Sequence, residues 1–171
     1  TLSNSYELHS SEMDRRQELD LSVKYIEKAQ ELSGGQNVRY ALRNAVLLRR
    51  IGMLFNETAL FDRALKIAQD ALAFPDATVV VGPKEGIARQ NRYELQSFIA
   101  RYFVEQAVTA RQKKDEQAAK QFYEMAVKAV EEITQLVGGS TTIIAQQWQG
   151  MLSVAGGNDK EGYRTLYKVY Q

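Results

Sequence analysis

The sequence predicts an all-α protein built from helix hairpins. Only two of its 171 residues are proline, which favours long uninterrupted helices. Apolar residues recur every three or four positions along most of the chain, which is the period of an amphipathic helix. Three Gly-Gly pairs separate these periodic segments, and glycine commonly ends a helix because it adopts the left-handed conformation cheaply. Hydrophobic residues make up 44% and charged residues 25%, a composition typical of one globular domain.

The glycine pairs and the polar residues after them set the order of the helices, because Asn and Ser cap helix starts well. These corners are Gly34-Gly35 before Asn37, Gly138-Gly139 before Ser140, and Gly156-Gly157 before Asn158. Glu161 follows Asn158 by three residues, the spacing of a capping box. We expect seven helices, over about 11–33, 37–56, 58–74, 87–113, 115–137, 141–156 and 159–171.

Each long helix carries its apolar residues on one face. These faces are Leu21, Tyr25, Ala29 and Leu32; Leu48, Ile51, Gly52 and Phe55; Leu95, Phe98, Ile99, Tyr102, Phe103 and Ala107; and Phe122, Met125, Ala126, Ala129, Val130 and Ile133. We interpret Trp148, the only tryptophan, as a core anchor.

The segment 75–86 differs from the rest because it contains both prolines and a β-branched run. We expect an insertion loop with a short extended stretch, either a plain connector or a contact to a partner. A phosphate-binding loop is disfavoured, because the motif Gly-x4-Gly-Lys-Ser/Thr is missing and Pro83 removes a backbone donor.

Several kinds of site are excluded by composition. The chain has no cysteine, hence no disulfide, thiolate metal site or cysteine nucleophile, and its one histidine is His9. We therefore expect no metal, no cofactor and no catalytic residues. The net charge of +1 requires neither nucleic acid nor an anionic membrane, and no stretch reads as a transmembrane helix. The sequence assigns no compartment.

One spacing of small and aromatic residues recurs along the chain: small-x2-aromatic-x8-Ala-x3-small-x2-Ala. It is met by Gly52, Phe55, Ala64, Ala68 and Ala71, then by Ala107, Ala110, Ala119, Tyr123 and Ala126, and more weakly by Gly150, Ser153, Gly162, Leu166 and Val169. A small residue on the first helix of a pair lets the second helix approach closely. We expect Ala64 and Ala119 to complete that crossing.

This pattern resembles the tetratricopeptide repeat family, over about 45–78, 100–133 and 143–171. The resemblance implies a right-handed superhelical array, an α-solenoid, of about three helix hairpins plus an N-terminal helix. The chain departs from the family because its repeats start 55 and then 43 residues apart, rather than about 34, and because Gly162 replaces alanine. It resembles an irregular member, and a generic α-solenoid is the alternative.

The resemblance also implies a concave groove lined by the first helix of each pair. The family's lining positions fall on Val46, Arg49, Met53, Asn56, Arg101, Val104, Val108, Arg111, Gln147 and Met151, and less centrally on Glu57, Gln112, Ile144, Val154 and Ala155. Arginine suits carboxylates and methionine adapts to apolar shapes, so we expect an acidic, partly hydrophobic peptide or helix as partner. The alternative is that Arg49 and Arg111 are solvated surface charges.

The function that these observations favour is a non-catalytic scaffold or adaptor that binds a protein segment. One alternative is an RNA-binding helical repeat that uses arginine stripes on two helices, and another is an accessory region of a larger enzyme. The stripes are Arg39, Arg43, Arg49 and Arg50, then Arg89, Arg92, Arg101 and Arg111. We interpret them as a solvated face or as partners of the acidic 7–31 segment, so nucleic acid is not the expected ligand.

The last predicted helix carries an apolar stripe, formed by Tyr163, Leu166, Tyr167 and Tyr170. Solenoids usually end in a polar capping helix, so this stripe predicts a cover. Because the chain starts at Thr1 and ends within a predicted helix, we interpret it as a fragment whose next repeat covers the stripe. Homo-oligomerisation or another partner is the alternative.

Overall fold

The computed structural model describes residues 2–78, 82 and 84–169, with side chains from Met13 onward. Contacts divide the chain into two compact units, Thr1–Thr78 and Val79–Gln171, and each is described by itself. Within the described ranges all regular structure is helical: α1 (Leu2–Leu32), α2 (Val38–Phe55), α3 (Thr58–Ala71), α4 (Glu85–Gln112), α5 (Glu116–Leu136), α6 (Ile143–Ala155) and α7 (Asp159–Val169).

The all-α prediction is therefore confirmed. Helix ends lie within three residues of the predicted bounds, except that α1 begins at Leu2 and not near residue 11. After α3 the chain makes turns through 72–78. The predicted extended stretch falls on 79–81 and 83, outside the described residues. No helix among the described residues is long and apolar enough to cross a membrane.

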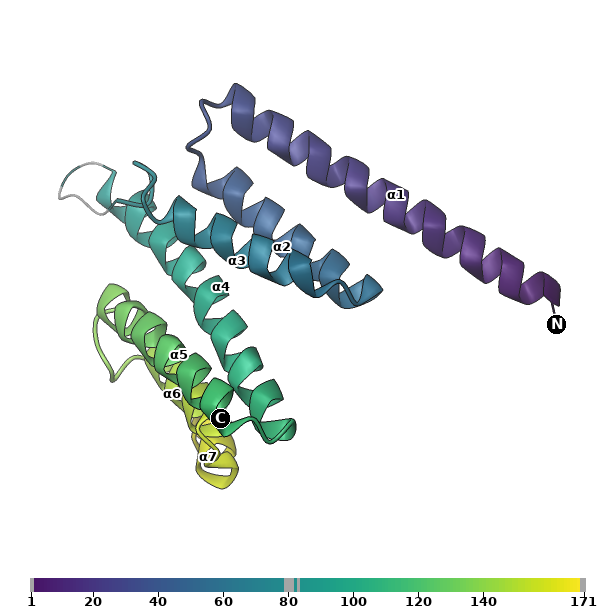
Figure 1. The fold of residues 1–171 in the computed structure, drawn as a ribbon. Helices are drawn as coiled ribbons and strands as arrows, with labels where there is room; N and C mark the ends of the chain where they lie inside the picture. The colour runs from purple at the N-terminus through teal and green to yellow at the C-terminus, as the bar shows by residue number, and fades with distance from the viewer. Residues whose placement is uncertain (1, 79–81, 83, 170–171) are drawn as a thin grey trace. The chain divides into compact units, whose positions relative to one another are not determined.

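The first unit contains α1, α2 and α3, and α2 contacts both other helices (Figure 1). Asn37 caps α2 as predicted, because its side chain accepts from the backbone N–H of Arg39 at 3.0 Å and of Tyr40 at 3.3 Å. The turn after α3 returns to the same helix start, where the Asp76 carboxylate accepts from the Val38 N–H at 3.2 Å. Two acceptors thus satisfy N–H groups that a helix start leaves unpaired.

The predicted close crossing of α2 and α3 is present at Gly52. A Cβ at this position would lie 3.0 Å from the Glu57 carbonyl oxygen and 3.4 Å from Leu60 Cβ, so α3 begins directly against the glycine. Ala64 is 1% exposed and Ile51 is fully buried. Gly52 and the alanines of α3 therefore let the two backbones approach, as the repeat spacing predicted.

The apolar face predicted for the first helix points to solvent. Leu21, Tyr25 and Leu32 are 49%, 68% and 77% exposed, while Val23 is buried. At 100° per residue, Val23 lies on nearly the opposite side of α1 from Leu21. The Val23 side faces α2, the helix whose backbone packs against α1, and the Tyr25 side lies opposite and is exposed.

The second unit consists of the hairpins α4–α5 and α6–α7, and α6 also contacts both α4 and α5. Its core contains most of the predicted periodic residues, including Leu95 and Ile133, and Trp148 is buried as expected. Met125, which was predicted on the same face of α5, is 47% exposed. Glu132 of α5 joins α5 to α4, because its carboxylate accepts from Arg92 at 2.9 Å and from Gln96 at 2.8 Å.

The corner before α6 differs from the prediction in its capping residue. Thr142, not Ser140, caps α6, and its hydroxyl oxygen accepts from the Ala145 N–H at 3.2 Å. The chain turns for two further residues after Ser140, because α6 starts only at Ile143. At the next corner Asn158 donates to the Glu161 carboxylate at 2.5 Å, so the two residues of the predicted capping box do meet.

The third repeat, which matches the spacing pattern most weakly, forms the α6–α7 hairpin, and its two helices cross very closely. A Cβ on Gly162 would lie 2.5 Å from Val154 Cγ2 and 2.7 Å from the Gly150 carbonyl oxygen. A Cβ on Gly150 would lie 2.8 Å from Leu166 Cγ. The α6–α7 hairpin therefore needs glycine where the family pattern expects alanine.

Leu166 accordingly does not belong to an exposed stripe on α7. It is half-buried and packs against Gly150, whereas Tyr163 and Tyr167 are 63% and 66% exposed. Tyr170 lies outside the described residues. The predicted surface is thus reduced to two exposed tyrosines.

Candidate partner-binding surfaces

An apolar hollow of about 370 Å³ lies between α1 and α2. We call it the α1–α2 hollow. One wall comes from α1 and the other from α2, and its lining is aliphatic except for two arginines: Ile26, Leu42, Val46, Leu47, Arg43 and Arg50.

The hollow exists because α2 has two different faces. Ala41, Ala45 and Leu48 are buried, while Leu42 and Leu47 are half-buried and Val46 is 51% exposed. Because successive residues of an α-helix are rotated by 100°, residues 42, 46 and 47 lie outside the stripe of buried positions. α2 thus buries one stripe and leaves a second apolar stripe at the hollow.

The two arginines of the hollow flank its apolar floor. Arg43 and Arg50 are exposed and seven residues apart, about 10 Å along a helix axis. Among the described side chains, neither guanidinium has a hydrogen-bond or ion-pair partner. On α4, by contrast, Arg89 pairs with Glu85 at 2.8 Å and Arg92 pairs with Glu132 at 2.9 Å. The charges of Arg43 and Arg50 are therefore not neutralised by a described side chain, whereas those of Arg89 and Arg92 are.

The α1 wall is held in place at its N-terminal side by Arg16. Its guanidinium lies 5.0 Å from the centre of the Phe55 ring, donates to Asp20 at 3.0 Å and forms a bidentate contact with Glu57. The hydrogen bond from Arg16 lowers the pKa of Glu57, and the same bond raises the pKa of Arg16. A second ion pair, Arg63 with Glu27, ties α3 to α1.

These pairs involve other arginines than the predicted stripes of α2. The arginines of α2 were expected to form a solvated face or to pair with the acidic 7–31 segment, and Arg43 and Arg50 are exposed. The two ion pairs that leave α1 reach Glu57, at the start of α3, and Arg63 of α3.

The groove residues predicted on α2 and at its end fall in four different environments. Val46 lines the α1–α2 hollow, and Met53, seven residues later, is 61% exposed. Arg49 is half-buried and has an interaction partner. Asn56 ends α2 in the left-handed conformation, at φ 55° and ψ 40°, and its N–H donates to the Gly52 carbonyl. Asn56 therefore has a structural role as a helix cap.

The predicted residues of α4 and α6 also separate. Val104 is only 7% exposed, so it belongs to the core and cannot line an open groove. The family's groove positions do not all apply to α4, because both α5 and α6 pack against it. Arg101 is exposed on α4, and Gln147 and Met151 are half-buried on α6.

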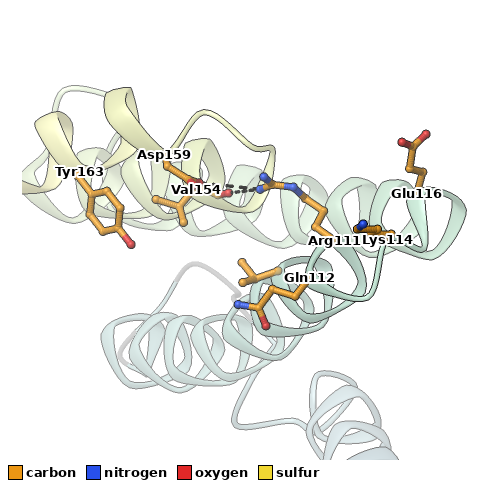
Figure 2. Close-up of a pocket in the computed structure, with 8 residues that line it drawn as sticks. Arg111, Gln112, Lys114, Glu116, Val154, Asp159 and Tyr163 are labelled. Atoms are coloured by element: carbon orange, nitrogen blue, oxygen red, sulfur yellow. Dashed lines mark hydrogen bonds and ion pairs between the residues drawn. The ribbon is translucent and has the colours of Figure 1, made fainter.

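Four of the predicted residues line a second hollow of about 500 Å³, where α4 meets α6 and α7: Val108, Arg111, Gln112 and Val154. We call it the α4–α6 hollow. Figure 2 shows Arg111 reaching from the end of α4 toward the end of α6. The α4–α6 hollow is lined by two positively and two negatively charged side chains. Its full lining is Val108, Arg111, Gln112, Lys114, Glu116, Val154, Asp159 and Tyr163.

Arg111 is bound by its own chain. Its Nη1 donates to the Val154 carbonyl at 2.7 Å and to the Ala155 carbonyl at 3.4 Å, and lies 4.0 Å from the Asp159 carboxylate. The last carbonyls of a helix lack intrahelical partners and carry partial negative charge. Arg111 thus caps α6 while its side chain stays partly exposed, a structural role that the sequence did not predict.

Sequence reasoning missed most of the α1–α2 hollow. Of the family positions on α2, only Val46 lines the hollow, and Arg49 and Met53 lie outside it. The signal was present in the spacing of Arg43 and Arg50, seven residues apart, with Val46 and Leu47 between them. Ile26 gave no signal, because its contribution depends on how α1 packs.

Among the side chains that the structure describes, no three His, Cys, Asp or Glu residues are grouped to hold a metal ion.

No protein-family model matches the chain, and neither a curated protein nor a solved structure is similar to it. The resemblance to tetratricopeptide repeats therefore rests on the recurring small and aromatic residues alone and stays a prediction.

Proposed function

We propose that the chain is a non-catalytic protein-interaction module, which binds an acidic amphipathic segment of a partner protein in the α1–α2 hollow. One observation carries this proposal. An open apolar floor is flanked by Arg43 and Arg50, whose charges no described side chain neutralises.

The chemistry of the hollow defines the partner. Burial of apolar surface supplies affinity at roughly 25 cal/mol per Å², and an amphipathic helix laid in a groove is a recurrent way to bury it. Arginine forks bind carboxylates in a bidentate geometry. Arg43 and Arg50 are two helical turns apart, so they match two carboxylates about 10 Å apart on either side of an apolar centre.

The wider scaffold role is supported by the hairpins. In the second unit, α6 packs on α4, and these are the first helices of consecutive hairpins. Contacts of this kind build the extended surfaces of α-solenoids. Met53, which is exposed on α2, would extend the partner surface of the first unit along its first hairpin helix.

A peptide-display selection on the immobilised chain tests the proposal. Enriched peptides should combine carboxylates seven residues apart with leucine, isoleucine or phenylalanine between them. Arg43→Glu with Arg50→Glu should weaken their binding by more than about tenfold, because two favourable charge contacts become repulsive. The control is Lys120→Glu with Lys128→Glu, the same charge change on exposed positions of α5, which should leave binding unchanged.

Enrichment of basic or uncharged peptides would contradict the proposal, as would equal losses in both double variants. RNA binding by the arginines would appear as an affinity for a uridine oligonucleotide that falls steeply with salt. That result, together with no peptide enrichment, would replace the protein partner with nucleic acid.

A further inference from the structure

The exposed residues of α2, apart from Leu54, form one continuous stripe along the helix, and this stripe includes Arg43, Val46 and Arg50 of the α1–α2 hollow. Its members follow one another by four, three, four and three residues, which is the spacing with which one helix faces another in a coiled coil. We call this stripe the α2 seam. Its members are Arg39, Arg43, Val46, Arg50 and Met53.

α1 carries an exposed stripe with the same spacing, which lies on the Tyr25 side of the helix, opposite the Val23 side that faces α2. Its members follow one another by four, three, four, three and four residues. We call this stripe the α1 seam. Its members, all exposed, are Asp14, Glu18, Leu21, Tyr25, Lys28 and Leu32. The two helices of one hairpin thus each expose a face with coiled-coil spacing.

The unpaired charges of the two seams have opposite signs. None of the three arginines of the α2 seam has a hydrogen-bond or ion-pair partner for its guanidinium group among the described side chains, and the same holds for the carboxylates of Asp14 and Glu18. Lys28, the other charge of the α1 seam, pairs with Glu31 at 2.8 Å. The α1 seam points away from its own α2, so these opposite charges can meet between two copies of the chain.

A parallel alignment of the α1 seam of one copy with the α2 seam of another matches five positions in a row, because the spacings are identical. The pairs are Asp14 with Arg39, Glu18 with Arg43, Leu21 with Val46, Tyr25 with Arg50, and Lys28 with Met53. Two of them are ion pairs, one is aliphatic, and one sets a guanidinium against an aromatic ring. The antiparallel alignment over five positions would instead place Lys28 opposite Arg43, two like charges.

We propose that the acidic amphipathic segment bound in the α1–α2 hollow is α1 of a second copy of this chain. This inference rests on the proposed function and names its partner. α1 and α2 run in opposite directions (Figure 1), so a two-fold axis across the helices lets α1 of each copy lie parallel to α2 of the other. Each contact is then made twice, and the product is a dimer. Apolar burial supplies its affinity, and the charges select the alignment.

The test is sedimentation equilibrium of the whole 171-residue chain at concentrations up to about 1 mM. We expect a dimer of the unsubstituted chain. Asp14→Lys with Glu18→Lys should weaken it at least about tenfold, because two attractive contacts become repulsive, and Arg39→Glu with Arg43→Glu should do the same. An equimolar mixture of the two double variants should associate again, because each reversed seam then meets a reversed seam of opposite charge. This recovery also shows that both variants are folded.

Two further measurements control for net charge and for alignment. Glu124→Lys with Glu131→Lys reverses two exposed acidic residues of α5 and should leave the dissociation constant unchanged. The chain has no cysteine, so a copy with Leu21→Cys mixed with a copy with Val46→Cys reports their proximity without background. Oxidation should join positions 21 and 46, as identified by mass spectrometry of the linked peptides. Leu32→Cys, about 16 Å further along α1, should not join position 46.

Four results would overturn the proposal. A chain that stays monomeric has another partner if display still enriches acidic peptides, and without that enrichment the proposed function fails as well. A dimer that both seam variants leave unchanged associates through another surface. Variants that do not associate when mixed would show that the charges of the two seams do not meet. Equal joining of positions 21 and 32 to position 46 would contradict the alignment.

Discussion

Replacing Gly162 by alanine should destabilise the α6–α7 hairpin, although alanine is the better helix former. The added Cβ would lie 2.5 Å from Val154 Cγ2, 2.7 Å from the Gly150 carbonyl oxygen and 2.9 Å from the Val154 nitrogen. Two of these three atoms belong to the backbone of α6, so the helices must move apart to admit a methyl group. Overpacking of this kind typically costs about 1–3 kcal/mol.

The helix preference for alanine opposes this cost by up to about 1 kcal/mol. The net expectation is therefore a loss of about 1–2 kcal/mol in the free energy of unfolding. The matched control is Gly86→Ala near the start of α4, where a Cβ would meet no atom within 4 Å. The control should be neutral or slightly stabilising, so the difference between the two variants isolates the packing cost.

Urea denaturation followed by the fluorescence of Trp148 measures both variants. Trp148 is the only tryptophan and is buried in α6, two residues before Gly150, so it reports on the hairpin directly. With a slope of roughly 2 kcal/mol per M, Gly162→Ala should lower the urea midpoint by about 0.5–1 M. An unchanged or raised midpoint in Gly162→Ala would refute the close backbone crossing of α6 and α7.

Three further predictions concern single contacts. Asn37→Ala should cost about 1 kcal/mol in urea denaturation followed by circular dichroism, because α2 loses its N-cap, and an unchanged midpoint would count against that cap. Arg111→Met should cost about 1 kcal/mol by Trp148 fluorescence and Arg111→Lys less, since lysine keeps the charge at the end of α6; equal stability of all three proteins would contradict the capping role. The lowered pKa of Glu57 means that its pairing with Arg16 stabilises the fold at neutral pH and is lost as the pH falls through the pKa of the folded state. Glu57→Gln should therefore flatten the acid limb of the stability profile, and an NMR titration that places the Glu57 pKa above its ordinary value would contradict the pair.

Local patterns predicted the helices well. The glycine pairs and Asn37 marked corners that the structure contains, and the buried positions of α4 and α5 follow the predicted apolar period. These features depend on a few neighbouring residues, which a sequence displays directly. The cap of α6 was placed two residues early because serine is on average a better capping residue than threonine, yet Thr142 and not Ser140 is the cap.

Packing between helices was harder to predict. The apolar face of α1 reads as a core face, yet Tyr25 is exposed, because only the structure shows which side α2 covers. Val104 and Leu166 were placed on surfaces for the same reason. Arg111 and Gly162 show the converse, since residues that looked like a surface charge and a poor match are fixed by atoms of α6.

The central claim is that the α1–α2 hollow binds a protein segment, and site-specific photocrosslinking tests it most directly. A photoreactive phenylalanine in place of Val46, which is half-exposed in the hollow, would be irradiated in lysate of the native source after nuclease treatment. The proposal predicts a discrete protein adduct that disappears when Arg43→Glu and Arg50→Glu are added and persists with Lys120→Glu and Lys128→Glu. An adduct of equal yield in both backgrounds, or no protein adduct at position 46, would contradict it.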